Sequence, residues 1–221
     1  MATTERDSLR YYPLFLDVSG KRCIVIGGGQ VASRKILKLL EAGADVVVIS
    51  PSPAEKIRRL AREGRIVLRM RKFRKGDLRG SILAIGATDD RDVNELVHSE
   101  AGKKSILVNV VDDVRLSSFI VPSTVKRGNL LIAVSTFGES PALSREIRIE
   151  LERLYGSEFG KFLNLMGTIR RRMKKSIPSG NRRAGTMRTF VREGMQALRR
   201  GKKVRDLRRS YLGRLALLEE K

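Results

Sequence analysis

The sequence predicts an α/β protein with a parallel sheet, followed by a small α+β segment and a basic all-helical C-terminal domain. Three observations lead to this prediction. Between residues 22 and 112, short apolar runs alternate with amphipathic helical patterns, as in a parallel sheet covered on both faces. After residue 113, two apolar runs are separated only by a turn, which is typical of a hairpin. From residue 157 onward only helical patterns occur.

The alternating region predicts five strands and three helices. Each predicted strand is apolar nearly throughout, and the predicted helices have apolar residues three and four positions apart. Gly43 marks the end of the first helix, and Ser52 and Pro53 mark the start of the second. The expected strands are 22–27, 45–50, 65–70, 81–88 and 105–112, and the expected helices are 30–43, 52–64 and 90–104.

The second half of the chain contains a hairpin and then helices. Two strands are expected within 117–138, joined by a Lys-Arg-Gly-Asn turn. A helix follows over 140–156, with Ser140 as its N-cap and Pro141 in its first turn. The later helical stretches are separated by 176–185 and 200–203. These boundaries predict three parts, which are 1–114, 115–156 and 157–221.

The chain is strongly basic, with 46 Lys and Arg against 24 Asp and Glu among 221 residues. Residues 161–221 alone carry 19 basic and 4 acidic residues. Such a charge attracts polyanions, whether nucleic acid, an acidic membrane surface or a small molecule with many carboxylates. No apolar run approaches the roughly 18–20 residues of a membrane span, and the N-terminus lacks a signal-peptide core. We therefore expect a cytoplasmic protein.

Cysteine and histidine each occur once, as Cys23 and His98. One cysteine excludes an intrachain disulfide framework, and the pair is too small for a Cys/His zinc site, so we expect no metal site. Cys23 opens an apolar strand and is expected to be a buried, inert thiol. His98 lies in an amphipathic helical pattern, where a surface or helix-end position is favoured. With no histidine suited to catalysis, a carboxylate is the natural proton acceptor.

The segment "IVIGGGQVAS" has the pattern G-x-G-x-x-A directly after a strand and at the start of a helix. This is the context of the dinucleotide-binding turn of a Rossmann domain. There the first glycine permits the turn, the second clears space for the pyrophosphate, and the helix N-terminus attracts the phosphates. A purely structural turn is the alternative. The expected cofactor-binding residues are Gly27, Gly28, Gly29, Gln30, Val31 and Ala32.

The end of the second strand lacks the acidic residue that usually binds the adenine ribose. The chain has Ser50, Pro51 and Ser52 at this point, and serine hydroxyls suit the same role. No arginine stands at the strand end to hold a phosphorylated ribose. NAD is therefore favoured over NADP.

Two further groups follow the fourth and fifth strands, where an open α/β sheet binds its ligand. Thr88 and Asp89 are expected near the ribose or nicotinamide, or else they cap the next helix. Asp112, in "VNVVDD", is the candidate proton acceptor, and a solvated loop acid is the alternative.

Taken together, these motifs resemble the precorrin-2 dehydrogenase family, which also forms the N-terminal part of siroheme synthases. The resemblance covers roughly residues 10–155 and includes "YYPLFLDVSGKRCIVIGGGQVASRK", "LLEAGADVVVISP", "AIGATDDRDVN", "VNVVDD" with "SSFIVPS", and "LLIAVSTFGESPALSREIR". It implies NAD-dependent oxidation of precorrin-2 to sirohydrochlorin in siroheme biosynthesis. It also implies a homodimer whose interface is the strand pair after the Rossmann domain. The eight carboxylates of precorrin-2 would explain the basic surplus.

The resemblance also implies roles for single residues. Asp112 matches the family's catalytic aspartate, and Gln30, Val31, Pro51 and Ser52 match positions that line NAD. Thr136 stands where some members have a serine linked to phosphorylation and tetrapyrrole binding. The substrate-binding residues expected on this basis are Asn109, Ser135 and Thr136.

Three alternatives stay open at this point. Some family members also insert iron or cobalt into sirohydrochlorin, and Asp112 would then serve both reactions. The chain could instead be a non-catalytic dinucleotide sensor. It could also bind nucleic acid through its basic tail, although few aromatic residues are present there for base stacking, namely Phe159, Phe162, Phe190 and Tyr211. We therefore expect a small-molecule substrate and no nucleic acid.

Overall fold

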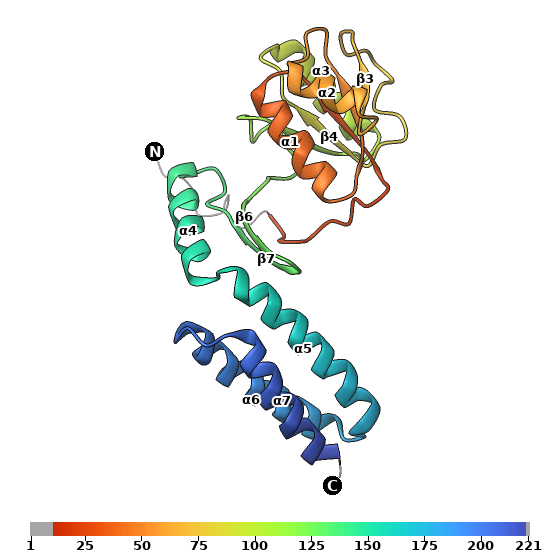
Figure 1. Cartoon of the computed structure of the whole chain (residues 1–221). Helices are drawn as coiled ribbons and strands as arrows, with labels where there is room; N and C mark the ends of the chain where they lie inside the picture. The colour runs from red at the N-terminus through yellow and green to blue at the C-terminus, as the bar shows by residue number, and fades with distance from the viewer. Residues whose placement is uncertain (1–10, 220–221) are drawn as a thin grey trace. The chain divides into compact units, whose positions relative to one another are not determined.

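The structure is a computed structural model in which residues 11–219 are described. It forms two compact units, one ending at Val121 and the other beginning at Pro122 (Figure 1). Residues 1–10 and 220–221 lie outside the described residues, so the expected lack of a signal peptide falls largely there. The predicted division into three parts stays a prediction.

The first unit contains a five-stranded sheet in the order β3-β2-β1-β4-β5, and every neighbouring pair is parallel. The predicted parallel α/β fold is thus confirmed. Three helices connect the strands (Figure 1). In chain order, the elements are β1 (Arg22–Ile26), α1 (Gln30–Glu41), β2 (Asp45–Ile49), α2 (Glu55–Arg62), β3 (Val67–Arg69), β4 (Leu83–Gly86), α3 (Arg91–Lys103) and β5 (Leu107–Val110).

Both faces of this sheet are buried, because successive side chains of a strand point to opposite faces. In β1, Cys23 and Val25 enter one core, while Ile24 and Ile26 enter the other. Helices α1 and α2 cover the first core, and α3 covers the second. The link from β3 to β4 contains no helix, and it covers part of the second core with two buried side chains, Phe73 and Leu78.

Helix α2 begins later than the sequence predicts. It starts at Glu55 with Ala54 as N-cap, instead of at Ser52. The reason is that the preceding residues pack against the glycine turn: the Ala54 N–H donates to the Gly28 carbonyl at 2.8 Å. Strands β3, β4 and β5 are also shorter than predicted, since the residues beyond them form loops. These loops line the site described below.

The second unit consists of a hairpin followed by helices (Figure 1). Helix α4 begins as predicted, with Pro141 in its first turn and the Leu143 N–H donating to Ser140 Oγ at 3.2 Å. Helix α6 begins at Gly180, inside the expected separator 176–185, because the link needs only residues 177–179. The elements are β6 (Ser123–Arg127), β7 (Leu130–Val134), α4 (Pro141–Leu154), α5 (Ser157–Ser176), α6 (Gly180–Arg199) and α7 (Val204–Glu219).

Helices α5, α6 and α7 share one apolar core. Phe190 and Tyr211 stack in it with ring centroids 4.4 Å apart, and the Tyr211 hydroxyl donates to the Phe190 carbonyl at 2.9 Å. Within the described range 11–219, no helix is both long enough and apolar enough to span a membrane. Cys23 is fully buried, which confirms the predicted burial of this thiol, and burial raises its pKa to about 11.

Candidate functional site

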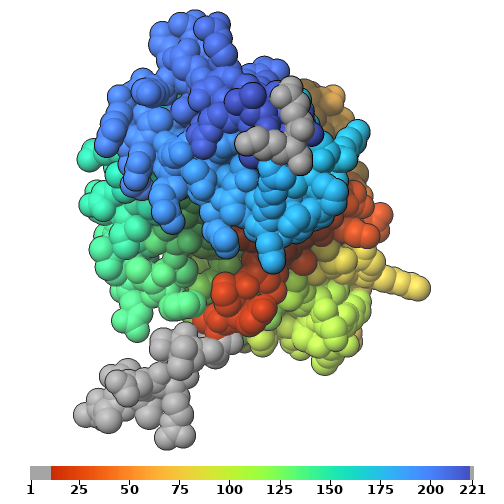
Figure 2. Space-filling model, turned by 90° about the horizontal axis from the view of Figure 1, so that it is seen from below, coloured from red at the N-terminus to blue at the C-terminus, as the bar shows by residue number. Residues whose placement is uncertain are grey.

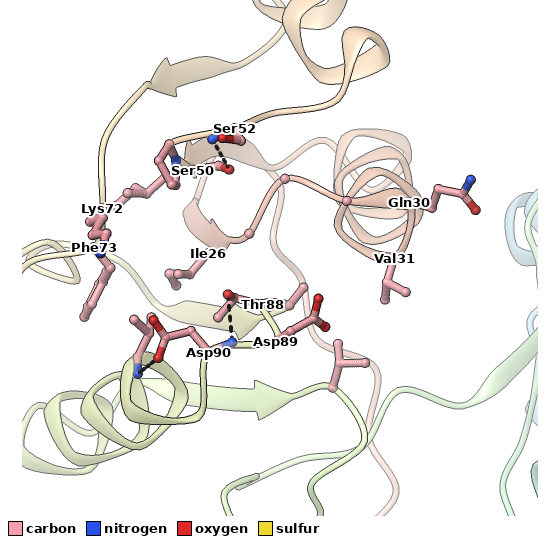
Figure 3. Close-up of a pocket in the computed structure, with 18 of the residues that line it drawn as sticks. Ile26, Gln30, Val31, Ser50, Ser52, Lys72, Phe73, Thr88, Asp89 and Asp90 are labelled. Carbon is pink, nitrogen blue, oxygen red and sulfur yellow. Dashed lines mark hydrogen bonds between the residues drawn. The ribbon is translucent and has the colours of Figure 1, made fainter.

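A cavity of about 460 Å³ lies at the carboxyl ends of the sheet strands in the first unit (Figure 3). This is where an open α/β sheet binds ligands. Most residues predicted for the site line this cavity, although they come from four separate segments of the chain. They are Gly27, Gly28, Gly29, Gln30, Val31, Ser50, Pro51, Ser52, Thr88, Asp89 and Asp112.

The three glycines of the turn have different reasons to be glycine. Gly27 has φ +127°, and a Cβ there would lie 2.0 Å from the Ala87 carbonyl oxygen. A Cβ on Gly28 would lie 2.4 Å from Ser50 Oγ. Both residues are thus required by the packing of the protein itself. A Cβ on Gly29 would meet no protein atom within 4 Å, so the space beside it is open to a ligand.

The N-terminus of α1 opens beside Gly29, which is its N-cap. No side chain caps this end, and no acidic residue lies in the first turn. The first N–H groups of a helix lack intrahelical partners and carry a partial positive charge, which attracts phosphate. Ala32 does not line the cavity; it is fully buried under the helix, where its small side chain allows close packing on the sheet. The turn therefore fits the pyrophosphate of a dinucleotide.

In the loop after β4, different residues cap α3 and line the cavity, although the sequence is compatible with both roles for Thr88 and Asp89. Asp90 caps α3, because its Oδ1 accepts the Val93 N–H at 3.2 Å (Figure 3). Thr88 Oγ1 accepts the Asp90 N–H at 3.2 Å, and the Thr88 carbonyl accepts the Asn94 amide at 2.9 Å. The capping role thus falls to Asp90, which leaves the Asp89 carboxylate on the cavity wall without a capping role.

The loop after β5 holds Asp112 in an uncommon backbone conformation, with φ +61°. Residues other than glycine rarely adopt this left-handed region, and such outliers cluster at functional sites. Asp113 fixes the loop from one side, since its Oδ1 accepts the Arg115 and Leu116 N–H groups at 2.9 and 3.3 Å. Ser117 fixes the other side by donating to the Asp113 carbonyl at 2.7 Å.

The residues after this loop are tied back to β5. Ser117 Oγ accepts the Val110 N–H and Ser118 Oγ accepts the Val108 N–H, each at 2.9 Å. The amide of Asn109 is buried and donates to the Phe119 carbonyl at 3.1 Å, so the structure does not bring this predicted substrate residue into the cavity. These bonds close the loop around Asp112.

His98 also contacts this loop. Its Nδ1 lies 2.9 Å from the Leu116 carbonyl oxygen, and the residue is half-buried within α3, so it lies on the predicted helix but is only partly exposed. Because it packs against the loop that carries Asp112, His98 contributes to the position of the loop rather than to the cavity wall.

Comparison with known proteins agrees with this site. Residues 14–123 match a family model described as NAD(P)-binding. A solved structure named "SirC, precorrin-2 dehydrogenase" matches 93% of this chain and 99% of its own, with a TM-score of 0.78 and 25% sequence identity. The chain is thus similar to a precorrin-2 dehydrogenase over nearly its whole length. The predicted resemblance is thereby confirmed.

Siroheme synthases are similar to this chain over three quarters of its length. That of Photobacterium profundum is 40% identical over 169 residues, and that of Methylococcus capsulatus is 44% identical over 168 residues. Each alignment covers 76% of this chain but only 36% and 35% of the relative. The chain thus spans little more than a third of the length of these siroheme synthases.

Some residues that line the cavity do not belong to any recognisable sequence motif. Lys72 and Phe73 line the cavity from the loop after β3. Their place after a strand is the one signal that could have found them. Strand β3 neighbours β2 in the parallel sheet, so the residues that follow β3 lie at the same edge as those that follow β2. Lys35, four positions after Val31 on α1, does not line the cavity but lies close enough to Asp112 to interact with its charge. Burial and Lys38 lower the pKa of its ammonium group, and the nearby Asp112 opposes that shift.

Ser135 and Thr136 lie in the second unit, outside this cavity. Thr136 Oγ1 donates to the Ser140 carbonyl at 2.9 Å and accepts the Ser140 N–H at 3.2 Å. Ser135 Oγ accepts the Phe137 N–H at 3.0 Å. Both hydroxyls thus shape the turn before α4, and their predicted contact with substrate stays a prediction. Among residues 11–219, no group of three or more His, Cys, Asp and Glu is arranged to hold a metal ion.

Proposed function

We propose that this chain oxidises precorrin-2 to sirohydrochlorin with NAD as the hydride acceptor. The observation that carries the proposal is that the open space beside Gly29 and the carboxylate of Asp112 border one cavity. A dinucleotide and a carboxylate side by side suit a reaction that removes a hydride and a proton from one substrate. The solved relative named precorrin-2 dehydrogenase supports this choice of substrate.

The chain's own residues bind and orient the reactants. The N–H groups at the start of α1 would hold the pyrophosphate, and the Ser52 hydroxyl would bind the adenine ribose. When bound, NAD supplies a two-electron hydride acceptor. Asp112 takes the proton that leaves the substrate carbon, and the closed loop around it keeps the carboxylate in one place. Holding the reacting groups in register supplies much of the acceleration in such a reaction.

Replacing Asp112 by Asn separates an enzyme from a dinucleotide sensor. Asn tolerates the left-handed backbone, so the fold is retained while the proton acceptor is lost. We expect turnover of precorrin-2 to fall about 100-fold or more, with NADH binding kept. Asp92→Asn is the matched control, because Asp92 is exposed on α3 and does not line the cavity. A parent protein that binds NADH and never reduces NAD in the presence of precorrin-2 would establish a sensor.

Helices α5, α6 and α7, which run from teal to blue in Figure 2, carry many Lys and Arg residues and suit a substrate rich in carboxylates. Most of these Lys and Arg residues have no acidic partner among the described residues. The ion pairs on these helices are Arg172 with Glu219, Arg205 with Asp206, and Arg214 with Glu193. A field of this sign raises the local concentration of anions and steers them by charge. We therefore expect the KM for precorrin-2 to rise with ionic strength.

Nucleic acid is the weaker candidate for this surface. Binding of single strands relies on aromatic faces, but all four aromatic residues of the three helices, Phe159, Phe162, Phe190 and Tyr211, are buried in their shared core. Any binding of nucleic acid would thus be electrostatic and without sequence preference. A DNA or RNA sequence bound selectively at 0.2 M salt would favour the nucleic-acid function instead.

We further propose that the second unit forms a homodimer through its hairpin and α4. A two-stranded sheet is marginally stable by itself, and β6 and β7 pair only with each other among the described strands. Large apolar side chains are exposed beside them, including Leu131, Leu143 and Leu154. Leu143→Glu and Leu154→Glu should lower the molar mass measured by light scattering to one chain. Leu217→Glu, at an exposed leucine of α7, is the matched control.

A further inference from the structure

The end of β2 has no carboxylate to exclude a phosphorylated ribose. In NAD-specific Rossmann domains an acidic residue at this point bonds the ribose hydroxyls and repels a 2′-phosphate. Here Ser50, Pro51 and Ser52 occupy the position. The carboxylates that line the cavity come instead from the loops after β4 and β5, and they are Asp89, Asp90 and Asp112.

Lys72 provides a positive charge at this end of the cavity. It follows β3, which pairs with β2, and in Figure 3 it lies on the same side of the cavity as Ser50 and Ser52, away from Asp89. Its ammonium group has no ion-pair partner within residues 11–219, whereas the neighbouring Arg69 and Arg71 both bond to Asp77. The charge of Lys72 is therefore available to a ligand.

The backbone of Lys72 is held in place from both directions. The Arg71 guanidinium donates to the Lys72 carbonyl at 3.0 Å and to both carboxylate oxygens of Asp77 at 2.7 Å. Phe73 is buried in the second core of the sheet. The Gly76 N–H donates to the buried carboxylate of Glu100 at 3.0 Å. Binding of a ligand thus has to order little more than the lysine side chain.

The hydroxyls at the strand end are not equivalent. Ser50 is buried, and its Oγ accepts the Ser52 N–H at 3.3 Å (Figure 3). Ser52 and Lys72 are both exposed and both line this end of the cavity, so their hydroxyl and ammonium groups are available to a bound adenine ribose. A hydroxyl and an ammonium donate hydrogen bonds to a phosphate, and neither repels it.

We propose that Lys72 receives the 2′-phosphate of NADP, so that the cavity binds NADP as well as NAD. This inference rests on the proposed dehydrogenase function, since it concerns the same cofactor site. Ser52 donates a hydrogen bond to the ribose hydroxyl or to the phosphate. The choice between the two cofactors is then set by one exposed charge, which gives weak and salt-dependent discrimination.

Fluorescence titration with NADH and NADPH tests the proposal by binding alone, without substrate turnover. We expect the two dissociation constants to agree within about ten-fold. Lys72→Ala should weaken NADPH relative to NADH by about five-fold, which is the effect of one exposed ion pair. The difference should shrink as salt is raised from 0.05 to 0.5 M. Ser52→Asp should exclude NADPH by about ten-fold or more, because it restores a carboxylate at the strand end.

Lys75→Ala is the matched control. Lys75 lies in the same loop, carries the same charge and is exposed, but it does not line the cavity. An equal effect of both lysine variants on the NADPH to NADH ratio would overturn the assignment of Lys72. Binding of NADH with NADPH excluded more than 100-fold would overturn the proposal and leave the dehydrogenase function intact. If neither nucleotide binds, the cofactor site itself is wrong.

Discussion

Replacing Gly29 by Ser should stabilise the fold and weaken cofactor binding at the same time. Gly29 is the N-cap of α1, with φ −82° and ψ −168°, an extended conformation open to any residue. A serine hydroxyl caps the first-turn N–H groups better than glycine, and serine has less freedom in the unfolded chain. We expect the free energy of unfolding to rise by about 0.5–1 kcal/mol.

The same side chain would occupy the space needed by the pyrophosphate. No protein atom lies within 4 Å of a Cβ at Gly29, so the steric cost falls on the ligand alone. The serine hydroxyl would also accept the N–H groups that otherwise donate to the phosphates. Loss of one charge-assisted hydrogen bond costs about 1.5–3 kcal/mol. The dissociation constant of NADH should therefore rise by about 10- to 100-fold.

Gly28→Ala is the matched comparison, because its Cβ meets the protein instead of the ligand. The new atom would lie 2.4 Å from Ser50 Oγ and 2.8 Å from Pro53 Cα, which should cost about 1–3 kcal/mol of stability. Urea unfolding followed by circular dichroism, together with NADH fluorescence titration, measures both effects. A Gly29→Ser variant that binds NADH as tightly as the parent would refute the assignment of this space to the pyrophosphate.

Three further predictions concern the loops of the first unit. Ser117→Ala should lower the free energy of unfolding by about 1–3 kcal/mol, because the buried Val110 N–H loses its acceptor. It should also lower kcat more than it changes KM, because the loop that carries Asp112 becomes less ordered. An unchanged kcat in steady-state kinetics would contradict this prediction. Asp112→Gly should abolish turnover yet raise the urea midpoint, since glycine adopts φ +61° without strain. Arg71 lowers the pKa of the Asp77 carboxyl below 3.8, so the pair stabilises the fold above about pH 4 and this stabilisation is lost as the pH falls through the lowered pKa. Asp77→Asn should thus be less stable than the parent at pH 7, and urea unfolding should show this difference shrinking as the pH falls below 4.

Much of the first unit follows from its sequence for a simple reason. Its strands are buried on both faces, so each appears in the sequence as an uninterrupted apolar run. The edge of the sheet that binds a ligand is formed by the residues that directly follow these runs. Gly27, Ser50, Thr88 and Asp112 all stand at those ends, and all line the cavity. Motif position along a parallel sheet is therefore enough to gather distant residues into one site.

Other features of the site depend on contacts that no periodic pattern records. The link from β3 to β4 is positioned by burial of Phe73 and by the bonds of Asp77 to Arg69 and Arg71, so the placement of Lys72 is not visible in the sequence. The left-handed backbone of Asp112 is likewise maintained by hydrogen bonds among polar residues. In the sequence, these residues look like those of an ordinary solvent-exposed loop. Burial of Asn109 and the late start of α2 are set by packing across the chain.

The most direct test of the proposed reaction is the stoichiometry of NADH formed per precorrin-2 consumed under anaerobic conditions. Absorbance follows the tetrapyrrole and the reduced nicotinamide in the same sample. We predict one NADH for each precorrin-2 converted to sirohydrochlorin, and no conversion when NAD is left out. Bound NAD that stays oxidised while precorrin-2 persists, or conversion that proceeds equally without NAD, would contradict the assignment of this cavity to hydride transfer.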